Sequence, residues 1–162
     1  MRVIGAAGLL ALCFVVGGCG SSESPRLSHD EYLQRLREIT SGRAAGTASR
    51  LFIKLVVDPG LPTPTCGATA RLFHSSVDEV ISEVAALSPP TDVADLQRRF
   101  VSAARESADL VGRAAGDATA GRLRCGRQMN RRIYGLPSTD RIDRMLIELR
   151  EKGYIIGLNS QD

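Results

Sequence analysis

The chain has 162 residues, of which 43% are hydrophobic and 24% are charged, and this composition describes one globular domain and excludes a disordered or collagen-like chain. Aromatic residues make up only 4% and tryptophan is absent, so the core must use aliphatic side chains and alanine, which favours packed helices over a sheet. The 21 basic and 18 acidic residues leave a net charge of +3, which is too balanced for a nucleic-acid-binding protein.

The first nineteen residues have the pattern of an export signal. Met1 and Arg2 give a positive start, residues 3–16 are almost wholly apolar, and two glycines precede Cys19. A charged start, an apolar stretch and small residues are the layout of a secretory signal. Residues 3–18 carry no charge, but they are fewer than the roughly 20 residues that a membrane-spanning helix needs. A cleaved signal is therefore the better interpretation.

The order Val16-Gly17-Gly18-Cys19 resembles the lipobox of bacterial lipoproteins, with valine where leucine is commoner. The resemblance implies that a diacylglycerol is attached to the Cys19 thiol and that residues 1–18 are cleaved away. It also implies a protein held on the cell membrane and facing outside the cytoplasm. The alternative is a plain secretory signal that happens to be followed by a cysteine.

Residues 19–27 are predicted to be a lipidated, flexible tether, because the segment after Cys19 reads GSSESP. About eight such residues reach roughly 15 Å. Two acyl chains retain a protein on a bilayer durably, whereas one chain gives only reversible binding. The folded part, residues 28–162, would then sit close to the membrane but not in it.

Two helices are predicted between residues 28 and 57. Ser28 and Glu31 have the spacing of a capping box, and the apolar residues behind them recur with helical period as far as Gly42. Residues 43–57 place their apolar side chains on one helical face, although the end of this segment is also compatible with a strand. Residues 58–65 contain three prolines and are predicted to be a stiff loop that excludes helix.

A long antiparallel hairpin is predicted next. Residues 67–87 carry an apolar stripe with acidic and serine residues opposite, and a second stripe runs from Val93 to about Gly116. A step with two prolines separates the two segments. Their lengths of roughly 31 and 36 Å match, and a short turn between matched helices predicts a hairpin.

The pattern is weaker after Gly116. Glycines interrupt residues 117–135, and a short last helix is predicted from Thr139 to about Gly153. The apolar tail that begins at Tyr154 and continues through Ile155, Ile156 and Leu158 is expected to dock on the bundle, since an exposed apolar tail would favour aggregation. The alternative is that the tail is a patch that binds a partner. The fold class is therefore all-α, a bundle of four to five helices.

Two short motifs give a second resemblance. The step Leu87-Ser88-Pro89-Pro90 and the pair Gly153-Tyr154 make the chain similar to small helical lipoproteins of high-GC Gram-positive bacteria. Many of those proteins turn a hairpin at such a proline step and end in a helix followed by Gly-Tyr. They mostly lack an assigned activity, so the resemblance implies an architecture and a location and no reaction.

Two cysteines remain once the signal is removed and Cys19 is lipidated. Cys66 and Cys125 are an even pair in an oxidising compartment, so one disulfide between them is predicted, with two free thiols as the alternative. A metal site would need further ligands, and neither His29 nor His74 is spaced near a cysteine. No metal and no cofactor are expected.

One pair of side chains has the spacing for chemistry. His74 and Asp78 are four residues apart on a predicted helix, where a carboxylate can orient a histidine as a general base. No nucleophile motif and no phosphate-binding glycine loop accompanies them. A boundary histidine paired with a surface carboxylate is the preferred interpretation, and no enzymatic activity is expected.

Charge is unevenly distributed along the chain. Residues 78–95 hold five acidic and no basic residues, whereas residues 113–132 carry a net charge of +5. Five arginines of the second stretch are candidate contacts with anionic lipid or a wall polymer: Arg122, Arg124, Arg127, Arg131 and Arg132. The alternative is that the two stretches are solvated faces that pair with each other or with their neighbours.

These features predict a lipid-anchored module that acts by binding another envelope protein, a wall polymer or anionic lipid, without catalysis and without nucleic acid as a partner. The alternative is a carrier that holds an apolar or lipid molecule between helices. The small side chains of the fourth predicted helix, such as Ala103, Ala104 and Ala108, would leave room for such a ligand.

Overall fold

The computed structural model describes residues 25–58, 60–135 and 137–154 of the chain. Within these residues the structure is all-α, with six helices and no strand. The helices are α1 (His29–Ser41), α2 (Arg43–Val57), α3 (Thr63–Ala85), α4 (Ala94–Thr119), α5 (Arg127–Tyr134) and α6 (Pro137–Glu151). The predicted fold class is confirmed, with one helix more than the four to five expected.

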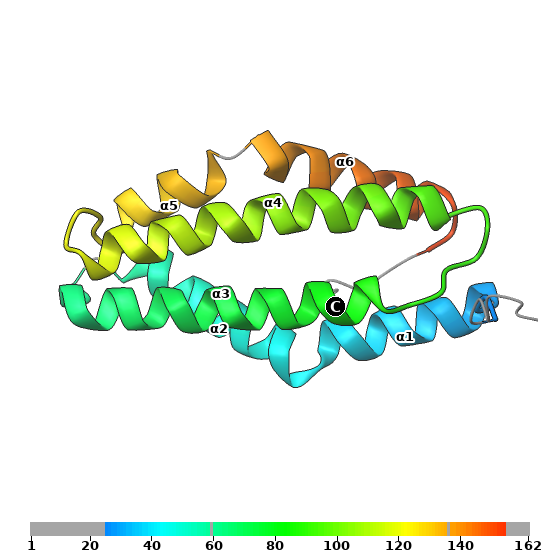
Figure 1. Cartoon of the computed structure of the whole chain (residues 1–162), viewed down its shortest axis with the longest axis horizontal. Coiled ribbons are helices and arrows are strands. Elements are labelled where there is room, and N and C mark those ends of the chain that lie inside the picture. The colour runs from blue at the N-terminus through cyan, green and yellow to red at the C-terminus, as the bar shows by residue number, and fades with distance from the viewer. Residues whose placement is uncertain (1–24, 59, 136, 155–162) are drawn as a thin grey trace, which may run out of the picture.

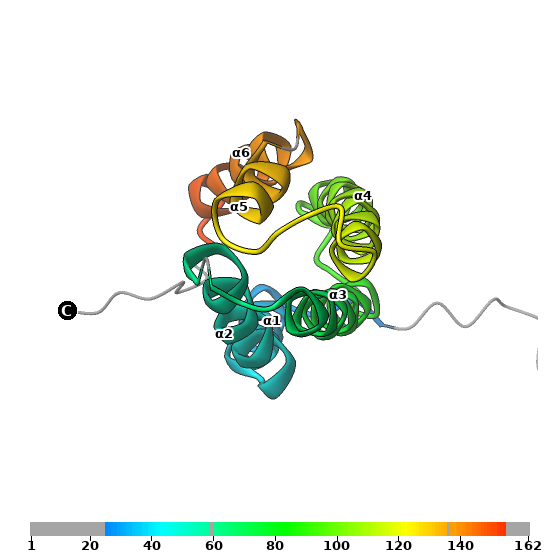
Figure 2. The ribbon, with the colours of Figure 1, turned by 90° about the vertical axis from the view of Figure 1, so that its left-hand side faces the viewer.

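The six helices form four rods that run alternately in opposite directions (Figure 1). The first rod is α1 followed by α2, the second is α3, the third is α4, and the fourth is α5 followed by α6. Viewed along the bundle, α2, α5 and α6 lie on one side and α3 and α4 on the other (Figure 2). The arrangement is an up-and-down four-rod bundle in which the outer two rods are broken.

The first rod is broken at Gly42. This residue has extended backbone, with φ −68° and ψ 172°, and its N–H donates to the carbonyl of Ile39. A Cβ at this position would lie 3.0 Å from the carbonyl oxygen of Glu38, so a larger residue would crowd the end of α1. The break therefore ends α1 and lets α2 begin within the same rod of the bundle (Figure 1).

The two unbroken rods form the predicted hairpin. With 23 and 26 residues, α3 and α4 are about 35 and 39 Å long. The prediction for residues 58–65 is wrong at its end, because α3 already begins at Thr63 with Pro64 in its first turn. Proline is tolerated there since the first helical N–H groups have no intrahelical acceptor. The fourth predicted helix also continues past Gly116, to Thr119.

Two clusters of buried side chains fill the bundle. One lies toward the turn between α3 and α4 and includes Tyr32, Leu96, Leu149 and Tyr154. The other lies toward the opposite end and includes Leu55, together with residues of α3 to α5. Because α3 and α4 contribute to both clusters, the central hairpin joins the two halves of the core.

The start of the described chain is fastened to the turn between α3 and α4. The N–H of Leu27 donates to the carbonyl of Ser88 at 2.9 Å, and Arg26 donates to Thr91. The capping box at Ser28 and Glu31 is present, and its hydrogen bonds hold the pKa of Glu31 below its ordinary value. The last two residues of the predicted tether are therefore part of the bundle.

Candidate functional site: a cationic surface on α2 and α5

The predicted disulfide between Cys66 and Cys125 is present, with 5.7 Å between the Cα atoms. Cys66 lies in the first turns of α3, Cys125 lies just before α5, and both are buried. The N–H of Gly126, whose φ of 77° suits glycine, donates to the carbonyl of Leu55 at 2.7 Å. The start of α5 is thus fixed covalently to α3 and by a hydrogen bond to α2.

The five arginines predicted to form a binding surface are all exposed and lie around the beginning and the length of α5. Arg122 is paired with Asp117, with 2.8 Å between Nη2 and Oδ1. The other four have no carboxylate within salt-bridge distance among the described residues: Arg124, Arg127, Arg131 and Arg132. The structure therefore leaves these four guanidinium groups available to a partner.

Helix α5 packs against α2, and this contact enlarges the cationic area. The rings of Tyr134 and Phe52 meet edge to face, with centroids 5.5 Å apart. Helix α2 contributes three further exposed cations, Arg43, Arg50 and Lys54. Neither α2 nor α5 contains an acidic residue, so each carries a net charge of +3.

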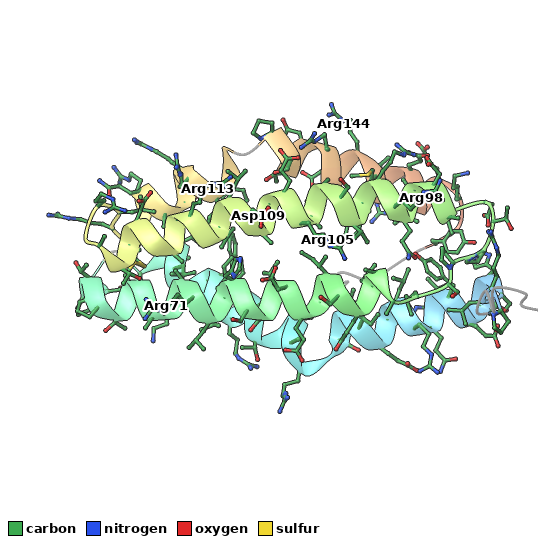
Figure 3. All side chains as sticks on the ribbon, viewed as in Figure 1. Arg71, Arg98, Arg105, Asp109, Arg113 and Arg144 are labelled. Carbon is green, nitrogen blue, oxygen red and sulfur yellow. A yellow bond between two sulfur atoms is a disulfide. The ribbon has the colours of Figure 1, made fainter. Side chains whose placement is uncertain are left out.

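The other four described helices are neutral or acidic. Their net charges are −1 for α1, −2 for α3, 0 for α4 and −1 for α6. Arg98, Arg105 and Arg113 run along α4 (Figure 3), but the same helix carries four acidic residues. The two cationic helices of the described chain are therefore neighbours in the fold.

Three large apolar side chains are exposed on the same two helices. Ile53 and Val57 of α2 are 56% and 68% exposed, and Tyr134 of α5 is 57% exposed. Ile53 and Val57 are four residues apart, so they share one face of α2. We call these three residues and the six cations of α2 and α5 the α2–α5 surface.

The part of this surface on α2 was missed from the sequence. The sequence does contain a signal for it, because residues 43–57 carry three cations and no acid. The three cations of α2 indicate a binding surface only together with those of α5. The contact between the two helices, whose residues are about 80 positions apart in the chain, is not visible in the sequence.

The acidic stretch at residues 78–95 does not pair with the arginine stretch within the described part of the chain. Asp95 binds Arg98 and Arg99 one turn further along α4. Asp92 accepts the hydroxyl of Tyr154, and Asp78 lies beside His74. Thus Asp78 and Asp95 pair within their own helices and Asp92 pairs with Tyr154, while none of these contacts joins the acidic stretch to the arginine stretch.

His74 and Asp78 do lie together, with 3.3 Å between Nδ1 and Oδ2. The other face of the imidazole lies against Gly112 of α4, where a Cβ would come within 2.9 Å of Nε2. His74 therefore lies between Asp78 of its own helix and Gly112 of α4, and both members of the pair stay partly exposed. Among the described residues no group of three side chains has the arrangement to hold a metal ion.

An open groove of about 600 Å³ lies between α4 and α6. Its floor includes Ala103, and ion pairs cross it from Arg99 to Glu148 and from Arg141 to Glu106. Arg144 stands on its rim (Figure 3). The other small residues predicted to leave room for an apolar ligand, Ala104 and Ala108 among them, are buried in helix packing.

Cys19 and the lipobox lie outside the described residues, as do Ile155, Ile156 and Leu158 of the tail. Within the described residues, none of the helices combines the length and the apolar character that a membrane crossing requires. No family model, no curated protein and no solved structure matches the chain.

Proposed function

We propose that the protein is a lipid-anchored binding module of the cell envelope, held on the outer side of the cell membrane through Cys19. Its working surface is the α2–α5 surface, which offers six exposed cations without a carboxylate on either helix. This surface is the observation that carries the proposal, since such a concentration of one charge attracts an anionic partner. The module acts by binding and not by catalysis.

The disulfide supports the location. Disulfides form and persist in oxidising compartments and are rare in the cytosol. The bond between Cys66 and Cys125 closes a loop between residues 59 positions apart and is buried in the described fold. A protein with such a bond is therefore expected in an oxidising compartment outside the cytoplasm.

The surroundings of His74 support the non-catalytic part of the proposal. A general base needs a substrate or a nucleophile within hydrogen-bond reach of its free nitrogen. Here Nδ1 of the imidazole faces Asp78 and Nε2 lies against Gly112 of α4, so the side chain contributes to the contact between α3 and α4.

The anchor is tested by the intact mass of the mature protein. We expect a product that begins at Cys19, carries the mass of a diacylglycerol and stays in the membrane fraction in 1 M salt. Cys19→Ala should remove the lipid mass, whereas the matched variant Cys13→Ala should leave it unchanged. A mature terminus without acyl mass would refute the anchor.

The binding role is tested by photo-crosslinking in intact cells. A crosslinker at Ser49, an exposed position on α2, should capture an envelope component. The same crosslinker at Ser75, exposed on α3, is the matched control and should capture less. Equal capture from both sites, or turnover of an envelope substrate that is lost in His74→Ala, would contradict the proposal.

A further inference from the structure

We infer that the α2–α5 surface docks on the anionic bilayer that holds the anchor, so that the bundle lies along the membrane on its broken rods. The occupant of the surface is the layer of anionic phospholipid headgroups. The inference rests on the proposed function, because it takes the lipid anchor as given and adds a second contact with the same membrane.

The pattern along α2 is that of a helix that lies in a membrane interface. Arg43, Arg50, Lys54 and Val57 follow one another at intervals of seven, four and three residues, which places them on one helical face with Ile53 beside them. All five side chains are exposed. Interfacial helices combine basic residues, which meet anionic headgroups, with apolar side chains that enter the acyl boundary.

Helix α5 repeats the same combination. Arg127, Arg131 and Tyr134 lie four and three residues apart on one face, and Arg132 is also exposed. The ring of a tyrosine is apolar and its hydroxyl is polar, which is why tyrosines gather at the membrane–water interface. Since α2 and α5 lie on one side of the bundle (Figure 2), both helices can contact one bilayer.

The position of the tether allows this orientation. The chain enters the bundle at Arg26, at the start of the rod that continues into α2 (Figure 1). Seven residues, 19–25, separate the chain before Arg26 from the proposed lipid site, and a flexible chain of that length spans roughly 15 Å. A bundle that lies along the membrane therefore stays within reach of its anchor.

If the bundle stood upright on the membrane, the α2–α5 surface would not contact the lipid. Helix α4 alone is about 39 Å long, and α5 begins at the end of the bundle away from the tether (Figure 1). Surface charges act over about 8–10 Å at physiological ionic strength. The cations at the start of α5 would then lie several screening lengths from the bilayer.

The apolar side chains favour lipid over other anionic partners. A hydrated polyanion would pair with the arginines and gain little from Ile53 and Val57, which are more than half exposed. A bilayer uses both, because its headgroups meet the cations and its acyl boundary accepts the aliphatic groups. The anchor also holds the surface at a high effective concentration next to the membrane.

The experiment measures how closely each side of the bundle approaches lipid. The lipidated protein is reconstituted in vesicles of 30% phosphatidylglycerol in phosphatidylcholine, or of phosphatidylcholine alone, with a fluorophore on Ser49→Cys of α2. The matched label is on Ser75→Cys of α3, and both positions are exposed. A quencher attached to the lipid headgroup reports the approach of the label to the membrane.

We expect strong quenching at position 49 in anionic vesicles, relief of that quenching in 0.5 M salt, and little quenching at position 75. The triple variant Arg50→Gln, Lys54→Gln and Arg131→Gln should weaken docking by roughly a hundredfold, because each cation near an anionic surface contributes about fivefold in binding. The matched variant Arg98→Gln, Arg105→Gln and Arg113→Gln removes the same charge from α4 (Figure 3) and should change docking by less than about threefold. Ile53→Ser with Val57→Ser should also weaken docking while the fold is unchanged by circular dichroism.

The outcomes separate the inference from the proposed function. Protein that leaves both kinds of vesicle in high salt has no anchor, and the proposed function fails. Protein that stays with both, but shows equal quenching at positions 49 and 75, overturns the inference alone. A soluble polyanion such as polyphosphate, added at physiological salt, is the last comparison. If it abolishes the quenching, and if it binds the wild-type protein and the variant Ile53→Ser with Val57→Ser equally well, the surface is assigned to a polymer and the inference is overturned as well.

Discussion

Tyr154 stacks on His29 with 4.2 Å between ring centroids, so the end of the described chain closes over its beginning. The Tyr154 ring also meets Tyr32 edge to face, and its hydroxyl donates to both carboxylate oxygens of Asp92 at 3.2 Å. The expectation that the apolar tail docks on the bundle is confirmed for this residue, which is 2% exposed. One side chain thus links α1, the turn before α4 and the end of α6.

This closure predicts a large effect of truncating the ring. Tyr154→Ala should lower the free energy of unfolding by about 3–5 kcal/mol, because a buried aromatic side chain is removed. Tyr154→Phe keeps the ring and should cost only about 1 kcal/mol, from the hydrogen bond to Asp92. Urea unfolding followed by circular dichroism measures both, and equal costs for the two variants would contradict the role given to the stacked ring.

A buried hydrogen-bond network around Gln97 makes a second prediction. Its Oε1 accepts the hydroxyl of Tyr32 at 2.7 Å, and its Nε2 donates to the carbonyls of Val84 and Leu87, near the end of α3. Gln97→Leu should cost about 1–3 kcal/mol, since it leaves the Tyr32 hydroxyl buried without an acceptor. Adding Tyr32→Phe should cost less than the sum of the two single changes, which a double-mutant cycle would show.

The same tyrosine predicts a loss of stability at high pH. Burial raises the pKa of Tyr32 from 10.0 to about 12, because the phenolate is poorly solvated there. A raised pKa means that the neutral side chain is favoured in the folded state, so stability is complete below pH 10 and falls as the pH rises toward 12. The loss is about 3 kcal/mol for a shift of this size.

Unfolding in urea at pH 9 and pH 11.5 tests this prediction. The wild-type protein should lose more stability between the two values than Tyr32→Phe does. Burial also raises the pKa of Tyr154, so the variant keeps part of the dependence. Tyr134→Phe, at an exposed position, is the matched control. An unchanged dependence in Tyr32→Phe would show that another group is responsible.

Two glycines predict opposite effects of one substitution. A Cβ on Gly67 of α3 would lie 2.7 Å from the Cα of Thr119 and 2.9 Å from its backbone nitrogen, whereas a Cβ on Gly116 meets nothing within 4 Å. Gly67→Ala should therefore destabilise the protein by about 1–3 kcal/mol through overpacking. Gly116→Ala should stabilise α4 by about 0.5–1 kcal/mol. Thermal unfolding of the two variants measures the signs, and an unchanged or raised stability of Gly67→Ala would refute the close packing at Gly67.

The disulfide predicts that the protein loses stability when the bond is reduced. Opening the bond should lower the free energy of unfolding by roughly 4 kcal/mol for a loop of 59 residues. Because Cys66 and Cys125 are buried, a phosphine reductant should act only as fast as the fold opens. Rapid reduction of the native protein, measured by thiol labelling and mass, would contradict this burial.

Local patterns predicted much of this fold. The apolar period and the flanking residues gave α2 its observed limits, Arg43 and Val57, and Ser28 with Glu31 marked the start of α1. The pairing of Cys66 with Cys125 followed because no other cysteine remained after Cys13 and Cys19 were set aside. In each case the deciding information lies within a few residues or in a simple count.

The remainder depends on contacts that no local pattern specifies. Pro64 lies inside α3 because the N–H groups of the first helical turn have no acceptor within the helix, so a proline costs nothing there. Gly116 lies inside α4 because buried residues before and after it in the sequence hold the helix against the bundle. Helix α5 has only eight residues, too few for a clear period, and its position is set by the disulfide and by the contact of Gly126 with Leu55. The contact between Gly126 and Leu55 is what places α5 beside α2, and it therefore brings the α2 half of the candidate site next to the α5 half.

The bond between Cys66 and Cys125 also turns the central hairpin into a covalent ring that contains nearly all of α3 and α4. A protease that cuts once in the turn at residues 86–93 would leave two fragments still joined through sulfur. The break at Gly42 lies outside that ring, so a cut there would separate α1 from the rest in covalent terms. The hairpin would therefore survive a single nick. If the protein is anchored through Cys19 as we propose, a cut at Gly42 in the first rod would release the rest of the bundle from the membrane.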